Sequence, residues 1–207
     1  PKSFLENMNF EKYVDMAINI PLLFIYKNNE HLRPEGKTFK DFMRGELSYL
    51  SKEQPNIKDF ETHLATIFSE VRLKKYIEIR SLDTCEWDCH CSGPAFYTGL
   101  IYGNLDEALE IIDKWKISEV MNAYAEAPEK GLSSIIEKKT LLEWGKIFLN
   151  LAKKGLEKRS IKNRNGKDET IFLRSIDNII DNKKSKATIM IEKFNKEKNL
   201  EFLYEKI

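Results

Sequence analysis

EVRLKKYIEIRSLD, residues 70–83, is the segment that decides how this chain folds. Its second half alternates with a period of two, which is typical of a β-strand with one face toward the protein interior. The residues at even positions share one face of this strand: Tyr76, Glu78, Arg80 and Leu82. The two isoleucines between them, Ile77 and Ile79, share the other face, and we expect that face to be half-buried.

The charged face of the strand brings two opposite charges together. Glu78 and Arg80 are two residues apart, so their side chains leave the strand on the same side, about 7 Å from each other. If this face lines a cleft, the pair can hold a cation and an anion. If it faces water, the two side chains form an ordinary solvated surface, as most charged residues do.

The composition restricts the class of protein. The chain has 207 residues, 42% apolar and 32% charged, which is typical of a soluble globular protein of one domain or slightly more. The net charge of +1 provides no basic field for nucleic acid or an anionic membrane, so we expect neither partner. The longest apolar run, AINIPLLFIY at residues 17–26, is about half as long as a membrane span requires.

The amino end and the cysteines give expectations about location. The first residues, PKSFLENMNFEKY, show no basic and then apolar leader, and they begin with proline, which suggests a piece of a longer chain. Three cysteines, Cys85, Cys89 and Cys91, are crowded into one loop, which favours reduced thiols and a cytoplasmic protein. A zinc site with His90 is not expected, because adjacent His90 and Cys91 cannot easily bind one ion.

Capping residues and helical periodicity predict the elements before the central strand. We expect a helix over residues 9–18 that begins at Asn9, a buried strand at 21–26, a short helix after Thr38, and a stronger helix over 57–68 that begins at Asn56. The apolar stripe of the last helix includes Phe68, and His63 lies at its edge. We expect His63 to be a partly buried, hydrogen-bonded histidine rather than a ligand.

The second half of the chain is predicted to be helical. Gly93-Pro94 begins one helix, Asn104 with Glu107 resembles a capping box, and Pro128 is expected to end a third helix. Further helices are expected over residues 138–156, 168–181 and 187–196. A few strands followed by helices indicate an α+β fold, in which the part from about residue 104 onward serves as scaffold.

Three motifs in one order resemble a known family. TFKDF (38–42), DFETHLATIFSEVRLKKYIEIRSLD (59–83) and PAFYTGLIY (94–102) resemble the carboxyl-terminal half of glutamate–cysteine ligase of the plant and proteobacterial type. The resemblance implies part of a glutamine-synthetase-like catalytic fold with few antiparallel strands, followed by a mostly helical region. It places the carboxyl-terminal part of the catalytic domain at residues 1–103 and a helical scaffold at residues 104–207.

The resemblance also implies an activity. In this family ATP phosphorylates the γ-carboxylate of glutamate, and the amine of cysteine attacks the acyl phosphate to give γ-glutamylcysteine, the first step toward glutathione. Mg²⁺ is a hard cation that prefers carboxylate oxygens and bridges protein and phosphates. Phosphoryl transfer depends on positioning and charge neutralisation, for which arginine is suited.

These requirements assign roles by resemblance. Glu78 is expected to bind the metal, and Arg80 to act in catalysis by binding the transferred phosphate or the substrate carboxylate. Arg72 is a candidate for a second carboxylate clamp, unless it is a surface arginine paired with Glu70. Phe68 and Tyr76 either form walls of the cysteine pocket or pack in the core.

The chain also departs from the family. The amino-terminal half that supplies further glutamates is missing before Pro1, so we expect the isolated chain to be inactive and the missing half to be a partner. Plant members carry a redox disulfide from the cysteine equivalent to Cys91, but no cysteine follows Cys91 here. Two alternatives stay open: a related carboxylate–amine ligase that uses another amine, and a non-catalytic half that regulates a separate subunit.

Overall fold

The computed structural model describes residues 8–50, 53–83, 85 and 87–204, with only the backbone of Asp88. The described chain forms two compact units, Pro1–Asp83 and Thr84–Ile207, and each unit is considered by itself. Within the described residues, no helix is long and apolar enough to cross a membrane.

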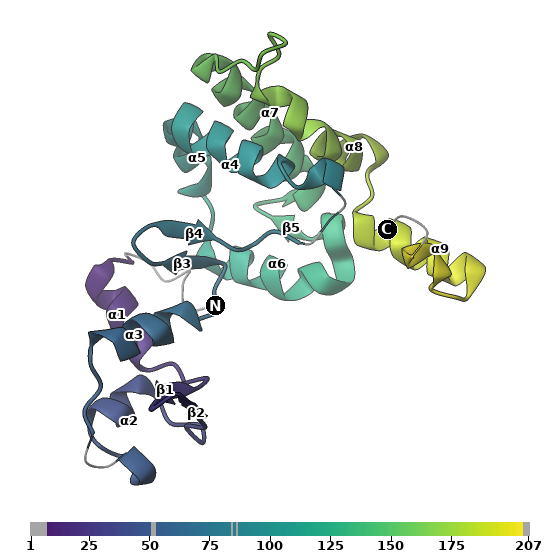
Figure 1. Ribbon diagram of the computed structural model, residues 1–207. Helices are drawn as coiled ribbons and strands as arrows, with labels where there is room; N and C mark the ends of the chain where they lie inside the picture. Colours follow the sequence, from purple (N-terminus) through teal and green to yellow (C-terminus); the bar gives the residue numbers. More distant parts are fainter. Residues whose placement is uncertain (1–7, 51–52, 84, 86, 205–207) are drawn as a thin grey trace. The chain divides into compact units, whose positions relative to one another are not determined.

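The first unit alternates short helices with two hairpins (Figure 1). Its elements in chain order are α1 (Phe10–Ile18), β1 (Ile25–Lys27), β2 (Glu30–Leu32), α2 (Phe39–Met43), the 3₁₀ helix η2 (Ser48–Leu50), α3 (Ile57–Ala65), β3 (Val71–Leu73) and β4 (Ile77–Ile79).

The second unit is mainly helical. Its elements are η3 (Trp87–Cys89), α4 (Ser92–Gly103), α5 (Leu105–Ile112), α6 (Ile117–Lys130), η4 (Gly131–Ser133), β5 (Ile135–Ile136), β6 (Lys139–Thr140), α7 (Leu141–Arg159), η5 (Glu169–Leu173), α8 (Arg174–Asn182), α9 (Lys186–Glu197) and η6 (Glu201–Leu203). The strands of the described chain pair only as antiparallel hairpins, β1–β2, β3–β4 and β5–β6, so the expected α+β class is confirmed.

The helix starts in the first unit follow their sequence signals. Asn56 accepts hydrogen bonds from the backbone N–H of Lys58 and Asp59, and the Asp59 carboxylate accepts from the backbone N–H of Asn56. This capping box satisfies backbone donors that the first helical turn leaves open. Asn9 caps α1 as expected, by accepting from the Lys12 N–H at 2.9 Å.

The core of the first unit is small. Its buried side chains come from the segment before β1, from β1 itself, and from α2 and the turn that follows it: Leu22, Ile25, Phe39, Phe42, Leu47 and Leu50. The strand expected over residues 21–26 is shorter than predicted, because only β1 pairs as a strand with β2, while Pro21 forms an isolated bridge with Thr38. Proline lacks the N–H that a continuous ladder needs.

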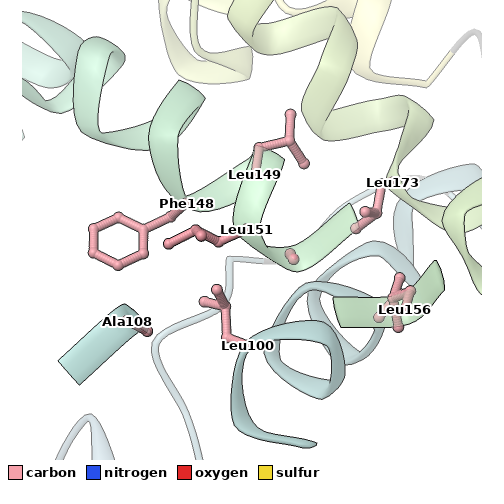
Figure 2. Packing of buried hydrophobic residues seen from close by; sticks show 9 residues of the cluster. Leu100, Ala108, Phe148, Leu149, Leu151, Leu156 and Leu173 are labelled. Atoms are coloured by element: carbon pink, nitrogen blue, oxygen red, sulfur yellow. The ribbon is translucent and has the colours of Figure 1, made fainter. Parts of the chain in front are cut away.

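The core of the second unit lies mainly between α4 and α7, and Figure 2 shows its apolar side chains. Leu100 comes from α4, whereas Phe148, Leu151 and Leu156 come from α7. The two helices approach closely at glycines: a Cβ atom placed on Gly99 would lie 2.2 Å from the carbonyl oxygen of Ala152. The contact is therefore backbone against backbone.

The compact units divide after Asp83, and α4 packs on α7 within the second unit. The assignment of residues 1–103 to the catalytic domain and of residues 104–207 to a scaffold stays a prediction. Two expectations for helix ends in the second unit differ from the structure. Asn104 makes no side-chain cap on α5; its amide donates to the Leu151 carbonyl at 2.8 Å. Pro128 does not end a helix, because α6 continues to Lys130 with Pro128 inside its last turn.

Candidate active site on the β3–β4 hairpin

The segment singled out by the sequence forms an antiparallel hairpin (Figure 1). Arg72 stands opposite Glu78 in the strand register. The turn is closed by a hydrogen bond from the Lys74 N–H to the Tyr76 carbonyl, and the Arg80 N–H donates to the Glu70 carbonyl at 2.7 Å. Directly opposed residues of such a pair have adjacent side chains on one face of the sheet.

Arg72 is the buried member of the hairpin, with 6% of its surface exposed. Its Nε donates to Glu78 Oε2 at 2.6 Å, and its Nη1 donates to the carbonyls of Ala65 and Ile67. Ala65 is the last residue of α3, where carbonyl groups lack partners within the helix. Arg72 therefore joins the carboxyl end of α3 to the hairpin.

Glu78 lies between two guanidinium groups. Its Oε2 accepts from Arg72, and its Oε1 lies 3.6 Å from Arg80 Nη1. The hydrogen bond from Arg72 is the main reason that the pKa of Glu78 is lowered, and the charges of Arg72, Lys74 and Arg80 lower it further against an opposing effect of burial. The carboxylate is thus held ionised, with 29% of its side chain exposed.

Arg80 is held from two sides. Its guanidinium carbon lies 5.4 Å from the centre of the Phe68 ring, within the range of a cation–π contact, and its Nη1 faces Glu78. The Phe68 side chain is 72% exposed, and the Arg80 side chain is 30% exposed. The cluster can therefore present a positive group and a carboxylate to a ligand from solvent.

The structure brings four of the five predicted site residues together and leaves Tyr76 outside the group. Arg72, Glu78, Arg80 and Phe68 form one connected set of contacts. Tyr76 lies at the hairpin turn, and its ring is 60% exposed. The alternative that Phe68 and Tyr76 pack in the core is wrong, because both side chains are mostly exposed.

The expected orientation of the strand is also wrong in one respect. Ile77 was expected on the half-buried face, but it is 69% exposed, whereas Ile79 is half-buried. The face of the hairpin that is directed inward is instead the one that carries Arg72 and Glu78. Burial of these charged groups is acceptable because they pair with each other and because Arg72 also finds carbonyl acceptors.

Two further hydrogen bonds join elements of the first unit. The Tyr13 hydroxyl of α1 accepts a hydrogen bond from the Leu73 N–H at 3.0 Å. Buried His63 of α3 contacts the Ala17 carbonyl of α1 through Nε2 at 2.8 Å, as expected for a hydrogen-bonded histidine. Burial lowers the pKa of His63, although the bond to Ala17 opposes this effect. No local sequence pattern indicates the Tyr13 contact, because its partner lies sixty residues away.

The cysteine loop differs from the expectation of reduced thiols. Cys85 and Cys89 form a disulfide, with a separation of 6.1 Å between their Cα atoms, and Cys91 is free and exposed. Two of the three thiols considered for zinc are therefore bonded to each other.

Within the described ranges, no three His, Cys, Asp or Glu side chains gather closely enough to hold a metal ion. Glu78 can supply one carboxylate. Mg²⁺ is often bound by one or two carboxylates together with substrate phosphates, so a single ionised carboxylate is compatible with a shared magnesium site.

Comparison with known proteins places this hairpin in an enzyme family. The family model for glutamate-cysteine ligase family 2 matches residues 1–206. The chain is 34% identical over 197 residues to the chloroplastic glutamate–cysteine ligase of Solanum lycopersicum, which covers 94% of this chain and 36% of that enzyme. It is 35% identical over 199 residues to the Arabidopsis thaliana enzyme, covering 95% and 37%.

The matches define the class first: the relatives are ligases. The chain belongs to glutamate-cysteine ligase family 2, as the resemblance of its three motifs implied. It spans about 36% of the length of the curated relatives that it matches.

The expected cytoplasmic location is wrong by the same comparison. The relatives from tomato, Arabidopsis and tobacco are named as chloroplastic enzymes. The expectation depended on reduced cysteines, and the disulfide between Cys85 and Cys89 removes that support.

Proposed function

We propose that this chain supplies the carboxyl-terminal part of a glutamate–cysteine ligase. The whole enzyme would join the γ-carboxylate of glutamate to the amine of cysteine in an ATP-dependent reaction through γ-glutamyl phosphate, at the first step of glutathione biosynthesis. Residues 1–103 would form one piece of a glutamine-synthetase-like catalytic fold, and the helical residues 104–207 would be its scaffold. The observation that carries this proposal is the Glu78–Arg80 pair, held by Arg72 and partly open to solvent.

Glu78 is proposed as a ligand of Mg²⁺. Its pKa is lowered mainly by the Arg72 hydrogen bond, so the carboxylate is ionised at neutral pH, as a ligand must be. Bound Mg²⁺ would neutralise charge on the phosphates of ATP. The other ligands would come from those phosphates and from the part of the enzyme outside this chain.

Arg80 is proposed as the catalytic residue of this chain, because it carries the accessible guanidinium of the cluster. A guanidinium can bind phosphate or carboxylate oxygens through two parallel hydrogen bonds. Contact with the Phe68 ring and with Glu78 limits the rotation of the Arg80 side chain before substrate arrives. Such preorganisation is the main contribution that a protein makes to phosphoryl transfer.

Arg72 is proposed as a positioning residue rather than a second carboxylate clamp. Its Nε and Nη1 already bind Glu78 and the carbonyls near the end of α3, and the residue is 6% exposed. It would fix the orientation of the Glu78 carboxylate. Phe68 and Tyr76 are proposed as walls of the cysteine pocket, since their exposed rings are available to contact substrate.

The proposal is tested in a ligase that contains this chain together with its amino-terminal part. ADP release is measured with glutamate and cysteine, and then with another amine in place of cysteine. Arg80→Lys keeps the charge but loses the planar fork, and we expect kcat to fall about 100-fold or more. Glu78→Gln should raise the Mg²⁺ concentration needed for half-maximal activity.

The matched control is Arg44→Lys, at an exposed arginine of the same unit, and it should leave kcat unchanged. Full activity of Arg80→Lys would contradict the catalytic assignment. Turnover by residues 1–207 alone would contradict the proposal that another part of the enzyme is required. Faster reaction with a different amine would favour the related carboxylate–amine ligase.

A further inference from the structure

A cavity of about 730 Å³ lies entirely within the helical unit. Its walls come from η3 and the residues after it, from η5, and from the first turns of α8. Pockets of 300–1,000 Å³ are typical for small organic ligands. The proposed ligase reaction uses none of these residues.

One side of the cavity is aromatic and open to water. Trp87 is 84% exposed and Phe172 is 42% exposed, and Ile171 beside it is 41% exposed. The Trp87 ring is braced by His90, with 5.6 Å between the ring centres. Aromatic side chains can bury 150–250 Å² each, so a flat apolar group placed here would remove a large area from water.

The polar groups of the cavity are basic or neutral. Its described lining contains Arg174, Asn178 and the free thiol of Cys91, and no carboxylate is among the lining residues that the structure describes. Within the part of the chain that the structure describes, Arg174 has no ion-pair partner. The nearby acid on α8, Asp177, is instead bonded to Lys153 at 2.5 Å.

Arg174 and Asn178 act together because of their spacing. They are four residues apart on α8, so they lie on the same face of the helix. A guanidinium provides a fork of N–H donors that matches a carboxylate, and the Asn178 amide can donate a further hydrogen bond. The cavity thus combines one anion-binding end with an apolar wall.

We propose that this cavity binds a small organic monoanion with a flat apolar body and a single carboxylate. The carboxylate binds Arg174 and Asn178, and the apolar body lies against Trp87 and Phe172. Among the described lining residues, one guanidinium with no further arginine or lysine favours a single negative charge over a polyphosphate. The aromatic wall favours an organic acid over a small inorganic ion.

The test is calorimetric titration of the full chain with 3-phenylpropionate, 3-phenylpropanamide and inorganic phosphate. We expect one site with a Kd on the order of 0.1 mM for 3-phenylpropionate. The neutral amide should bind about tenfold more weakly, because it lacks the charge that strengthens the hydrogen bonds to Arg174. Inorganic phosphate should bind more weakly than 3-phenylpropionate, because it makes no apolar contact.

Variants then assign the two halves of the site. Arg174→Gln and Trp87→Ala should each weaken 3-phenylpropionate binding about tenfold. Arg164→Gln is the matched control, because it removes the same charge from an exposed position of the same unit and should leave binding unchanged. Near-ultraviolet circular dichroism verifies that each variant is folded.

The proposal is overturned by any of four results. The first is equal affinity for the acid and the amide, and the second is an equal loss of binding in Arg174→Gln and Arg164→Gln. The third is the absence of saturable binding by the folded chain at concentrations up to about 10 mM. The fourth is equal affinity for inorganic phosphate, which would contradict the role of the aromatic wall.

Discussion

The Nε atom of Arg72 lies 2.6 Å from Oε2 of Glu78, across directly paired positions of β3 and β4. The same guanidinium binds carbonyls near the end of α3, so one buried side chain holds both the fold of the first unit and the carboxylate proposed to act in catalysis. These two effects can be separated by experiment.

Replacing Arg72 by methionine should destabilise the first unit. The change leaves the carbonyls of Ala65 and Ile67 without their donor, and we expect the free energy of unfolding to fall by about 2–4 kcal/mol. Urea denaturation followed by far-ultraviolet circular dichroism measures the loss. Arg80→Met is the comparison, because that side chain is 30% exposed, and it should cost less than about 1 kcal/mol. Equal losses for both variants would contradict the assignment of Arg72 as the structural arginine.

Glu78 should make the stability of the protein depend on pH in the acidic range. Its pKa is lowered in the folded protein from the usual value of 4.5, so the unfolded chain binds the proton more readily. The stabilisation is therefore present above about pH 4.5 and is lost as the pH falls through the folded pKa. Unfolding of the wild type and of Glu78→Gln is compared from pH 7 to pH 3. The difference between them should shrink on acidification; a constant difference would show that the carboxylate is not held ionised by Arg72.

His63 should make the stability of the protein depend on pH in a higher range than Glu78 does. Burial lowers its pKa below the usual 6.5, so stability is complete above that value and declines as the pH falls toward the folded pKa. His63→Phe removes the titrating group and keeps a ring to stack on Phe39, 5.3 Å away. We expect the variant to lose the slope of stability that the wild type shows as the pH falls below about 6.5, at the cost of the hydrogen bond to Ala17. Retention of the slope would assign it to another group.

The close contact between α4 and α7 at their glycines should leave no space for even a methyl group. A Cβ atom on Gly155 would lie 1.9 Å from the Gly99 carbonyl oxygen, so the helices must separate in Gly155→Ala. We expect a loss of about 2–3 kcal/mol in the free energy of unfolding, measured by tryptophan fluorescence.

Gly145→Ala on the same helix is the control for this prediction. There the added carbon meets only the end of the Ile180 side chain, at 3.0 Å, and alanine favours a helix over glycine by about 1 kcal/mol. This variant should be neutral or slightly stabilised. Similar losses in the two variants would mean that the close approach is not what limits Gly155.

The disulfide between Cys85 and Cys89 predicts how many thiols of the chain can react. Under non-reducing conditions, the denatured chain should react with one equivalent of a thiol reagent, at Cys91. After reduction it should react with three, since the sequence contains three cysteines. Three reactive thiols before reduction would show that Cys85 and Cys89 are not bonded.

Local signals in the sequence predicted the helix starts of the first unit and the central hairpin strand. Asn56 with Asp59 marked the start of α3, and the alternation around Glu78 marked β4, because caps and period-two patterns depend on neighbouring residues. The two charges expected on one face, Glu78 and Arg80, do lie 3.6 Å apart.

The predictions that proved wrong concern residues whose partners are distant in the sequence. Asn104 was expected to cap its own helix, but its amide binds the carbonyl of Leu151, forty-seven residues later. Arg72 is buried because the end of α3 supplies acceptors, which no pattern within residues 70–83 reveals. The exposure of Ile77 follows from the same cause, because the inward face is already filled by the charged pair. The roles of the site residues stay predictions.

The meeting of Gly99 and Gly155 sets the spacing of their two helices by the main chain, with no side chain between them to change rotamer. A backbone contact of this kind has no side chains that could rearrange to accommodate a displacement. If a ligand or a neighbouring part of the protein shifts one of these helices, we expect the other helix to move with it as one rigid body.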